Sequence, residues 1–313
     1  MNIYHRIKTL AERLSLFAKL KRKVAFKARL AGLERRVDFF IASIVASVIN
    51  LLTKIEALNK LIIVISQKIS LTKTIYDNKN KKDYIFHTPN PRTLKRARTF
   101  FVKEPRTLEW IDTFNSDDVL YDIGANIGVY TIYAGVNKKA ENILAFEPDS
   151  LNYAILNKNV FINGLYDRVA CYNIAFSDSS RLDYLYLSVL DPGSSCHNFG
   201  YPNEYVKKLK GTLKQGSISY TLDTFIDEFD PPFPNHIKID VDGLEKEIIV
   251  GALKTLQEKR LKSVLVEIDD NLAGSGEIIN FIQSSGLKLI SRKHTCFSGT
   301  GTDSNYLFVR QLG

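Results

Sequence analysis

One segment constrains the fold more than any other: an apolar run of strand length that passes through a glycine turn into a helical pattern. It reads Val119-Leu-Tyr-Asp122-Ile-Gly124-Ala-Asn126-Ile-Gly128. Nineteen residues after Gly128, a second apolar run ends in Glu147. A strand, a tight turn, a helix and a distal acid in this order are typical of the nucleotide-binding half of a Rossmann-like sheet.

The rest of the chain after about residue 90 alternates in the same way. Strand-length runs occupy residues 143–146, 169–174, 237–241 and 264–268, and helical patterns occupy 128–138, 149–162 and 245–257. This alternation predicts an α/β fold with a mostly parallel sheet and helices on both faces. Residues 181–188 and 217–222 are expected to form an added hairpin, and 306–310 a last, antiparallel strand at or near the edge.

The first part of the chain differs in composition. Residues 1–36 hold eleven Lys or Arg and two acids, which accounts for the whole formal net charge of +9. Apolar residues then recur every three or four positions from Leu30 to Ile69, a heptad-like spacing typical of long helices and coiled coils. The predicted organisation is a basic helical arm over 1–75, a polar linker over 76–95 and one domain over 96–313.

Three interpretations of the arm remain open. It self-associates or covers the domain as a long helix; it lies on a membrane surface through the basic cluster at 19–27 and the apolar run at 39–52; or it spans a membrane. The apolar run is 14 residues long, whereas a span needs about 20. Homo-oligomer formation or peripheral membrane contact is therefore expected through residues 1–72. The neutral remainder of the chain predicts no nucleic-acid partner.

The three cysteines, Cys171, Cys196 and Cys296, include no C-x-x-C pair. Such sparse usage predicts a reducing compartment and no structural zinc site. The expected location is cytoplasmic, with the inner face of a membrane as the peripheral alternative.

The glycine turn narrows the choice of cofactor. In the dinucleotide fingerprint G-x-G-x-x-G, Asn126 replaces the second glycine and Val129 the third, so a nicotinamide dehydrogenase is disfavoured. The loop leaves room for a compact sulfonium nucleoside, Gly124 allows close approach to a ligand, and Glu147 suits ribose hydroxyls. The predicted cofactor is S-adenosyl-L-methionine, held by Asp122, Gly124, Ala125, Asn126, Gly128, Glu147 and, beside the adenine, Ala175.

From about Arg98 to Arg310 the chain resembles the FkbM-type S-adenosylmethionine-dependent methyltransferases. The resemblance is carried by Lys103-Glu-Pro-Arg-Thr-Leu-Glu-Trp110, Asp122-Ile-Gly-Ala-Asn-Ile-Gly128, Phe146-Glu-Pro148, Asn163-Gly164, Thr221-Leu-Asp223, Ile237-Lys-Ile-Asp240-Val-Asp-Gly243-Leu-Glu245 and Val264-Leu-Val-Glu267. It implies a class I methyltransferase fold, a transferase activity, and an acceptor hydroxyl on a glycan, a lipid-linked sugar or a secondary metabolite. Asp242 departs slightly from the family, which more often has Glu there.

Asp240 and Asp242 are the predicted catalytic residues, because they follow a central strand at its carboxyl end, where such sheets bind ligands. Asp240 is expected to act as general base or as an orienting carboxylate, with Lys238 able to pair with a carboxylate. Capping of the next helix is the alternative role of Asp242. His197 is an alternative base, although a solvated loop histidine is the more ordinary interpretation.

No metal is predicted. The alternative is an Mg²⁺ site made by Asp240 with residues 269–271. The alternative function is a catalytically idle Rossmann-like scaffold whose helical arm binds a membrane or a partner; the intact glycine turn and Glu147 argue against it.

Overall fold

The structure is a computed structural model of residues 1–313. It describes residues 40, 43–45, 47–48, 51, 56–69, 71–137, 139–209, 213–271, 274–294 and 303–311. The chain divides into two compact units, Met1–Ser70 and Leu71–Gly313, and each is described by itself. In the first, the described elements include helix α2 (Glu56–Lys68), whereas most of the arm predicted over 1–75 lies outside the described residues. None of the described helices is both long and apolar enough for a membrane span.

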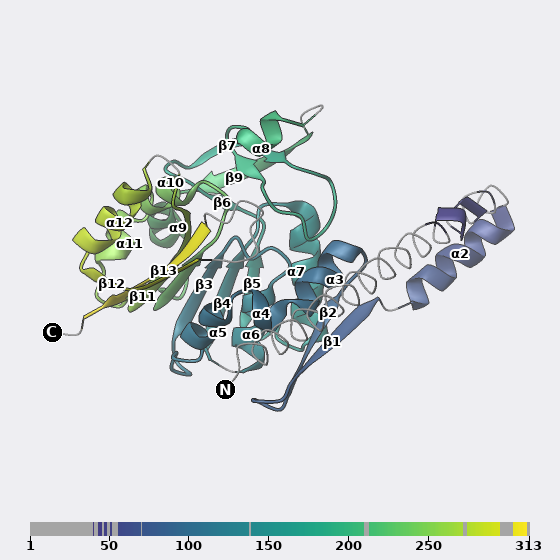
Figure 1. The fold of residues 1–313 in the computed structure, drawn as a ribbon, viewed down its shortest axis with the longest axis horizontal. Helices are drawn as coiled ribbons and strands as arrows, with labels where there is room; N and C mark the ends of the chain where they lie inside the picture. Colours follow the sequence, from purple (N-terminus) through teal and green to yellow (C-terminus); the bar gives the residue numbers. More distant parts are fainter. Residues whose placement is uncertain are drawn as a thin grey trace, which may run out of the picture. The chain divides into compact units, whose positions relative to one another are not determined.

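A seven-stranded sheet forms the centre of the second unit (Figure 1). Its order is β12-β13-β11-β10-β3-β4-β5, with β3 (Val119–Ile123), β4 (Asn142–Phe146), β5 (Val169–Tyr172), β10 (His236–Ile239), β11 (Ser263–Asp269), β12 (Leu287–His294) and β13 (Asp303–Arg310). The strands from β5 to β11 are parallel, and β13 runs antiparallel between β11 and β12. The prediction of a mostly parallel class I methyltransferase sheet with an antiparallel last strand is thus confirmed.

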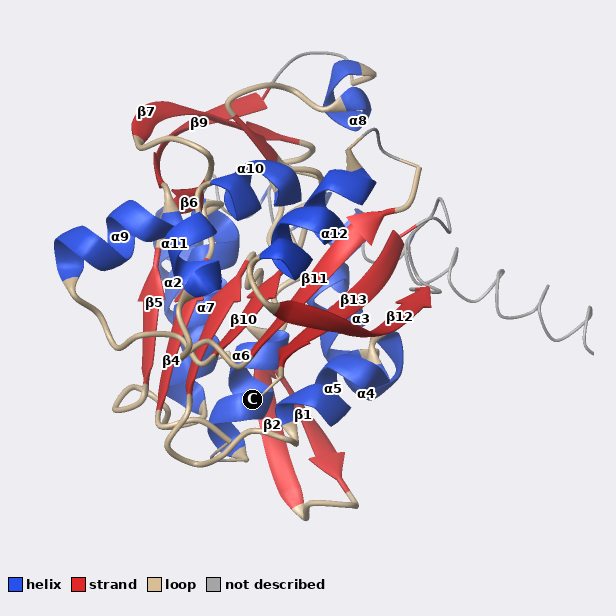
Figure 2. Cartoon of the chain, turned by 90° about the vertical axis from the view of Figure 1, so that its left-hand side faces the viewer, coloured by secondary structure: helices blue, strands red, loops and turns tan. Residues whose placement is uncertain are grey.

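Helices cover both faces of this sheet (Figure 2). Alternate residues of β3 divide between two cores: Tyr121 packs with residues of α9–α12, whereas Leu120 packs with residues of α5–α7. The helices are α5 (Pro105–Ile111), α6 (Val129–Val136), α7 (Ser150–Ile162), α9 (Leu222–Phe229), α10 (Glu245–Val250), α11 (Leu253–Gln257) and α12 (Ser275–Ser284). The single helix predicted over 245–257 is therefore two helices, interrupted around Gly251, where a Cβ atom would lie 2.3 Å from the Ser177 carbonyl oxygen.

The linker predicted over 76–95 is wrong. Strands β1 (Thr72–Asp77) and β2 (Lys82–His87) form an antiparallel hairpin, followed by α3 (Pro91–Arg98) and α4 (Phe100–Lys103). The polar composition of residues 76–95 did not indicate that Tyr84 and Phe86 would be fully buried, as they are in the structure. Asn163 of the domain also accepts a hydrogen bond from the Ile85 N–H at 2.9 Å and fixes the hairpin.

A smaller sheet follows the third strand of the core. Its order is β6-β9-β7-β8, with β6 (Ala175–Phe176), β7 (Arg181–Leu187), β8 (Asn198–Phe199) and β9 (Leu213–Tyr220), and with the short helix α8 (Glu204–Lys207) before β9. Strands β7 and β9 pair antiparallel as expected, but β8 and α8 lie between them in the chain, so the two strands are not joined as a hairpin. In Figure 1 this sheet lies beyond the carboxyl ends of the parallel strands, where the candidate site is found.

Candidate active site

The turn after β3 is shaped by close contacts within the protein. Gly124 has φ +80°, and a Cβ atom there would lie 1.9 Å from the Asp240 carbonyl oxygen. The missing Cβ atom at Gly124 therefore lets the backbone after β10 approach this turn closely. Gly128, at the start of α6, has φ +84° and faces Leu156 of α7, and Asn126 between them has φ +52°. The loop thus projects the Asn126 amide toward the end of β4.

Glu147 lies at the end of β4 with 5% of its surface exposed. Its Oε2 accepts the Asn126 N–H at 2.7 Å, and its Oε1 accepts the Asp149 N–H at 2.9 Å. Burial raises the pKa of Glu147 to about 7, although both backbone N–H groups partly offset that effect. The carboxyl group is therefore oriented by the glycine turn and poised to change charge near neutral pH.

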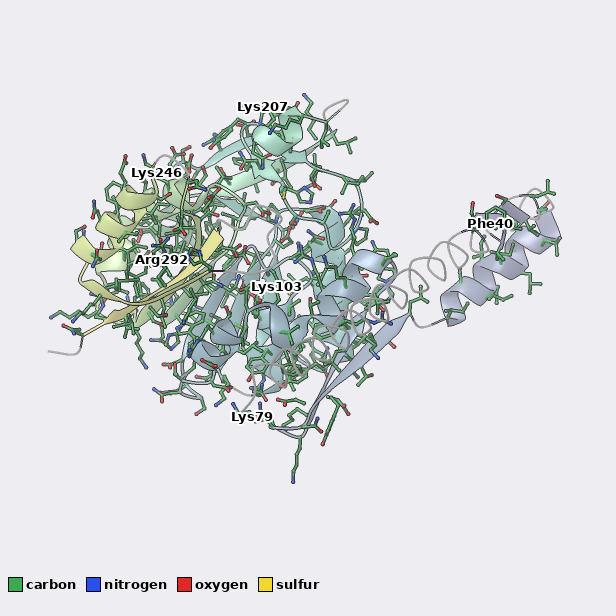
Figure 3. The ribbon with its side chains drawn as sticks, viewed as in Figure 1. Phe40, Lys79, Lys103, Lys207, Lys246 and Arg292 are labelled. Atoms are coloured by element: carbon green, nitrogen blue, oxygen red, sulfur yellow. The ribbon has the colours of Figure 1, made fainter. Side chains whose placement is uncertain are left out.

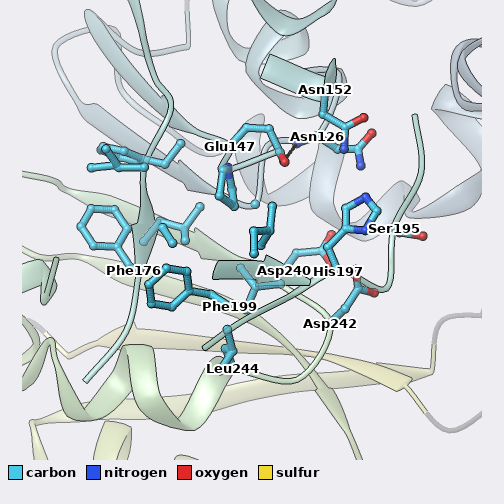
Figure 4. Close-up of a pocket in the computed structure, with 18 of the residues that line it drawn as sticks. Asn126, Glu147, Asn152, Phe176, Ser195, His197, Phe199, Asp240, Asp242 and Leu244 are labelled. Atoms are coloured by element: carbon cyan, nitrogen blue, oxygen red, sulfur yellow. Dashed lines mark hydrogen bonds between the residues drawn. The ribbon is translucent and has the colours of Figure 1, made fainter. Parts of the chain in front are cut away.

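A pocket opens beside Glu147 and has two chemically different ends (Figure 4). Polar side chains gather at one end, and Phe176, Phe199 and Leu244 line the other. The remaining lining residues are Ile123, Gly124, Asn126, Phe146, Pro148, Asn152, Ile174, Ala175, Leu185, Ser194, Ser195, His197, Asp240, Val241 and Asp242. Of the predicted cofactor residues, the structure places Gly124, Asn126, Glu147 and Ala175 in this lining.

Asn126 and Asn152 fix the loop that precedes β8 against the pocket. The Nδ2 of Asn126 donates to the Ser194 carbonyl at 2.6 Å, and the Oδ1 of Asn152 accepts the Gly193 N–H at 2.7 Å. Arg96 of α3 donates from Nε to the Gly193 carbonyl at 2.7 Å. Asn152 was not among the predicted site residues. Asn152 lies in the first turn of α7, shortly after Glu147 at the end of β4, and this position could have indicated from the sequence that it lines the pocket.

His197 is an oriented part of the pocket wall, so its interpretation as a solvated loop residue is wrong. It is 9% exposed. Its Nδ1 accepts the Ser188 N–H at 3.0 Å, which leaves the proton on Nε2, 3.2 Å from an Asp149 oxygen and 2.9 Å from the Ser194 hydroxyl. With both ring nitrogens engaged in this way, His197 has no free lone pair with which to accept an acceptor proton.

A second pocket adjoins the first and shares Gly124, Asn126 and Asp240 with it. Its other lining residues are Arg96, Thr99, Phe100, Lys103, Ala125, Val129, Tyr130 and Lys238. Ala125 is therefore placed here rather than in the pocket beside Glu147. Arg96, Lys103 and Lys238 line this space. Of these three cations, the sequence predicted an ionic role for Lys238 alone, and Lys103 was noted as part of a family motif.

Lys238 and Asp240 form a buried ion pair at the floor of the second pocket. The Lys238 Nζ lies 2.8 Å from Asp240 Oδ2 and 4.9 Å from the centre of the Tyr130 ring, and its side chain is 2% exposed. The predicted pairing of Lys238 with a carboxylate is confirmed. Burial works against ionisation of Asp240, but Lys238 and Lys103 outweigh it and hold the pKa of that carboxyl well below its usual range.

Asp242 has a different environment. It is exposed at the pocket wall, has φ +59°, and its Oδ2 accepts the Cys196 N–H at 2.7 Å. The surrounding walls restrict hydration and, together with Asp240, raise the pKa of Asp242. It makes no side-chain capping bond at α10, whose first turn is preceded by Leu244, so the helix-capping interpretation is wrong for Asp242.

Asp122 lies outside both pockets. It is the last residue of β3 that faces α6, is 1% exposed, and accepts a hydrogen bond from the Thr131 hydroxyl at 2.5 Å. Among the described residues its Oδ1 has no hydrogen-bond partner, and burial raises its pKa. Its position gives no support to the predicted contact with the cofactor. Gly128 is likewise absent from both linings and serves the packing of α6 on α7.

The residues of the alternative Mg²⁺ site are engaged elsewhere. Asp270 accepts hydrogen bonds from the hydroxyls of Tyr306 at 2.5 Å and Ser304 at 2.7 Å, and it pairs with Arg292 at 2.6 Å. In the part of the chain that the structure describes, no cluster of three or more His, Cys, Asp or Glu has metal-binding geometry.

A family model identifies the family to which the chain belongs. The Methyltransferase FkbM domain model matches residues 122–289, which is more than half of the chain, and the chain belongs to this family.

Curated relatives of this class act on different acceptors. The 31-O-demethyl-FK506 methyltransferase FkbM of Streptomyces tacrolimicus is 25% identical over 204 residues, covering 58% of this chain and 77% of that protein. The hexuronic acid methyltransferase AglP of Haloferax volcanii is 28% identical over 161 residues, covering 50% of this chain and 59% of AglP, which is less than two thirds of its length.

Solved structures match more distantly. The precorrin-6y C5,15-methyltransferase of Geobacter metallireducens matches with 14% identity and a TM-score of 0.40, covering 66% of this chain and 87% of that one. The TYW2 protein of P. horikoshii in complex with MeSAdo matches with 11% identity and a TM-score of 0.41, covering 78% and 73%. Likenesses this weak add nothing to the description of the site.

Proposed function

We propose that the chain transfers a methyl group from S-adenosylmethionine to a hydroxyl of a small-molecule or glycan acceptor. The observation that carries the proposal is Glu147, a carboxyl held by two backbone amides at the junction of a polar and an apolar pocket end. A nucleoside has the same division, because its ribose presents hydroxyl donors and its purine presents a flat apolar surface.

The residues present fit that cofactor. Each carboxylate oxygen of Glu147 keeps a further lone pair, so the pair of oxygens can accept two ribose hydroxyls. Ala175 and Phe176 belong to the apolar lining that suits the purine. The second pocket, with Arg96 and Lys103, suits the carboxylate of the amino-acid portion, which is contiguous with the ribose in the same molecule.

The bound cofactor would supply an electrophilic methyl group on a sulfonium. The chain's own task is to orient the acceptor and to take the hydroxyl proton. Asp240, whose pKa is held low by Lys238 and Lys103, is a weak proton acceptor and suits a fixed, orienting negative charge. Asp242 is exposed in the pocket with a raised pKa, and it is the better candidate for the proton acceptor.

A hydroxyl acceptor is favoured by the relatives. The printed name of the Streptomyces relative specifies a 31-O-demethyl compound, and that of the Haloferax relative specifies a hexuronic acid, a sugar with both hydroxyl and carboxyl oxygens. Both relatives are partial matches, so the acceptor class, and not an individual compound, is what we propose.

The test is transfer of labelled methyl from S-adenosylmethionine to a panel of sugars, uronic acids and macrocyclic alcohols, with product release measured in parallel. We expect label in at least one hydroxyl compound, and at least a tenfold lower turnover in Asp242→Asn. Asp167→Asn, at an exposed carboxylate outside both pockets, is the matched control and should retain wild-type turnover. Tight cofactor binding with no transfer to any acceptor would instead support the idle scaffold.

A further inference from the structure

Glu267 is a half-buried carboxyl in β11 to which the proposed methyl transfer gives no role. Its neighbours on the strand, Val266 and Ile268, belong to the core formed with α9–α12, so Glu267 faces the other side of the sheet. Leu265, two residues earlier on that side, packs in the core formed with α5–α7. A carboxyl group at the end of such an apolar face needs a polar partner to offset its loss of solvation.

The register of the sheet brings Glu267 beside Asp240. In the parallel pairing of β10 with β11, Lys238 lies opposite Leu265. Continuing that register by two residues, to the next position on the same face, places Asp240 opposite Glu267. The two carboxyl groups form a hydrogen bond with each other. Such a bond requires a proton on one of the two groups, because two carboxylates offer only acceptors.

Two lysines and one more acid lie around this carboxyl pair. The Lys238 Nζ lies 2.8 Å from Asp240 Oδ2, and the Lys103 Nζ lies 2.7 Å from Glu104 Oε1. Lys103, the last residue of α4, lies near the middle of the view in Figure 3. Among the described residues these are the ion pairs that the two lysines form, and Glu267 takes part in neither. Two cations therefore pair with two acids, and Glu267 is the third acid.

Glu104 is held on the far side of Glu267. It is 3% exposed, and its Oε2 accepts hydrogen bonds from the Thr107 hydroxyl at 3.1 Å and from Asn305 Nδ2 at 3.3 Å. Asn305 of β13 is the residue that pairs with Glu267 in the antiparallel register with β11. Glu267 thus lies between two acids whose positions are fixed by other partners.

The charges of this cluster decide which carboxyl carries the proton. Burial disfavours the charged form of Glu104, but Lys103 and Lys238 outweigh it and lower the pKa of Glu104. The same two lysines lower the pKa of Asp240. Burial and the carboxylates of Asp240 and Glu104 raise the pKa of Glu267 well above its usual range. The proton of the hydrogen-bonded pair therefore resides on Glu267.

We infer that Glu267 keeps its proton, donates it in a hydrogen bond to Asp240, and so acts as a positioning residue that fixes the Asp240 carboxylate where the two pockets meet. Asp240 lines both pockets, and Lys238 already engages its Oδ2. A second bond from β11 keeps the carboxylate from rotating when ligands exchange, and a charge fixed in advance needs no reorganisation during the reaction. The expected effect on turnover rests on the proposed function, whereas the protonation of Glu267 does not.

The experiment compares two substitutions of Glu267 in the full-length chain. Glu267→Gln keeps an uncharged donor at this position, whereas Glu267→Met has a similar length and no donor. We expect Glu267→Gln to keep kcat within about threefold of wild type, and Glu267→Met to lower kcat at least about tenfold, as expected for the loss of one hydrogen bond to a charged group. The KM for the acceptor and the calorimetric affinity for the cofactor should stay within about threefold in both variants. Glu228→Gln, at an exposed position of α9 outside both pockets, is the matched control and should behave as wild type.

An infrared measurement near neutral pH makes the test independent of methyl transfer. A protonated carboxyl has a carbonyl stretch that is separate from the carboxylate bands, so the difference spectrum of wild type minus Glu267→Gln should contain that stretch. The difference spectrum with Glu228→Gln should not contain it. This stretch supports the inference even where the wild type methylates no acceptor, a result that would contradict the proposed function alone.

Three results would overturn the inference. The first is the absence of that stretch, which would mean that Glu267 is ionised. The second is a loss of kcat in Glu267→Gln as large as in Glu267→Met, because the carboxylate itself would then be required. The third is wild-type kcat in Glu267→Met. Should Glu267→Met fail to fold in urea denaturation, kcat of Glu267→Gln and the infrared difference decide the question.

Discussion

Replacing Glu147 by Gln distinguishes the contribution of this residue to cofactor affinity from its effect on the free energy of unfolding. The amide keeps the size of the carboxyl and one oxygen for a backbone N–H, but it removes the negative charge that would accept ribose hydroxyls. Hydrogen bonds to charged groups contribute about 1.5–3 kcal/mol. At about 1.4 kcal/mol per factor of ten, cofactor affinity should fall roughly 10- to 150-fold in Glu147→Gln.

The same substitution should increase stability at alkaline pH. The pKa of Glu147 rises from 4.5 to about 7 on folding, so the unfolded chain releases the proton first and stability is lost as pH rises through that interval. The shift corresponds to a penalty of about 3 kcal/mol above pH 7, at 1.36 kcal/mol per unit. In the amide, one of the two backbone N–H groups faces an NH2 group and loses its acceptor. Subtracting about 1–3 kcal/mol for that buried donor leaves a net gain of at most about 2 kcal/mol at pH 8.

Glu245 supplies the control. It is also buried, burial raises its pKa to about 7, and it lines neither pocket. Glu245→Gln should therefore show a similar gain in the free energy of unfolding at pH 8, measured by urea denaturation, with unchanged cofactor affinity by calorimetry. Wild-type affinity in Glu147→Gln would refute the assignment of Glu147 to the ribose, whatever the stability shows.

Three further variants test other parts of the structure. Asp240→Asn should lower turnover more than cofactor affinity. It should also destabilise the fold by about 3 kcal/mol in denaturation experiments, because the buried Lys238 loses its partner. Adding Lys238→Met should restore stability but not turnover in product assays. Burial lowers the pKa of His236 from 6.5 to about 4, so the free energy of unfolding decreases by up to about 3 kcal/mol as pH falls from 6.5 to 4. His236→Gln should reduce this pH dependence of stability. An unchanged pH dependence in the variant would contradict the assignment of the effect to His236. Gly124→Ala should cost at least about 3 kcal/mol because its Cβ atom meets the Asp240 carbonyl, whereas Gly216→Ala, with nothing within 4 Å, should stay within about 0.5 kcal/mol.

The parallel core was predictable because its strands are predominantly apolar and its helices separate them. Strand β12 was not predicted. Leu287 is the one buried residue of this strand, and its other positions are half-buried or exposed, which is the pattern of an edge strand and not of the central ones. The hairpin β1–β2 was missed for a related reason: its stability comes from Tyr84 and Phe86 packing on the domain, a tertiary contact that a polar local sequence does not reveal.

The site was predictable in kind and less so in detail. The glycine turn and Glu147 identified the pocket, but the sequence could not show that the Asp240 carbonyl packs against Gly124. Nor could it show that Lys238 and Lys103 depress the pKa of Asp240 while Asp242 faces the pocket. These assignments depend on distances between residues that are far apart in the chain.

The central claim is that these pockets hold S-adenosylmethionine, and calorimetric titration of the full-length chain tests it most directly. The ligands are S-adenosylmethionine, its demethylated product, and NAD as a dinucleotide control. Binding of the first two with one-to-one stoichiometry, and none of NAD, is the predicted result. Binding of NAD, or no binding of either sulfur nucleoside by a folded sample, would contradict the account.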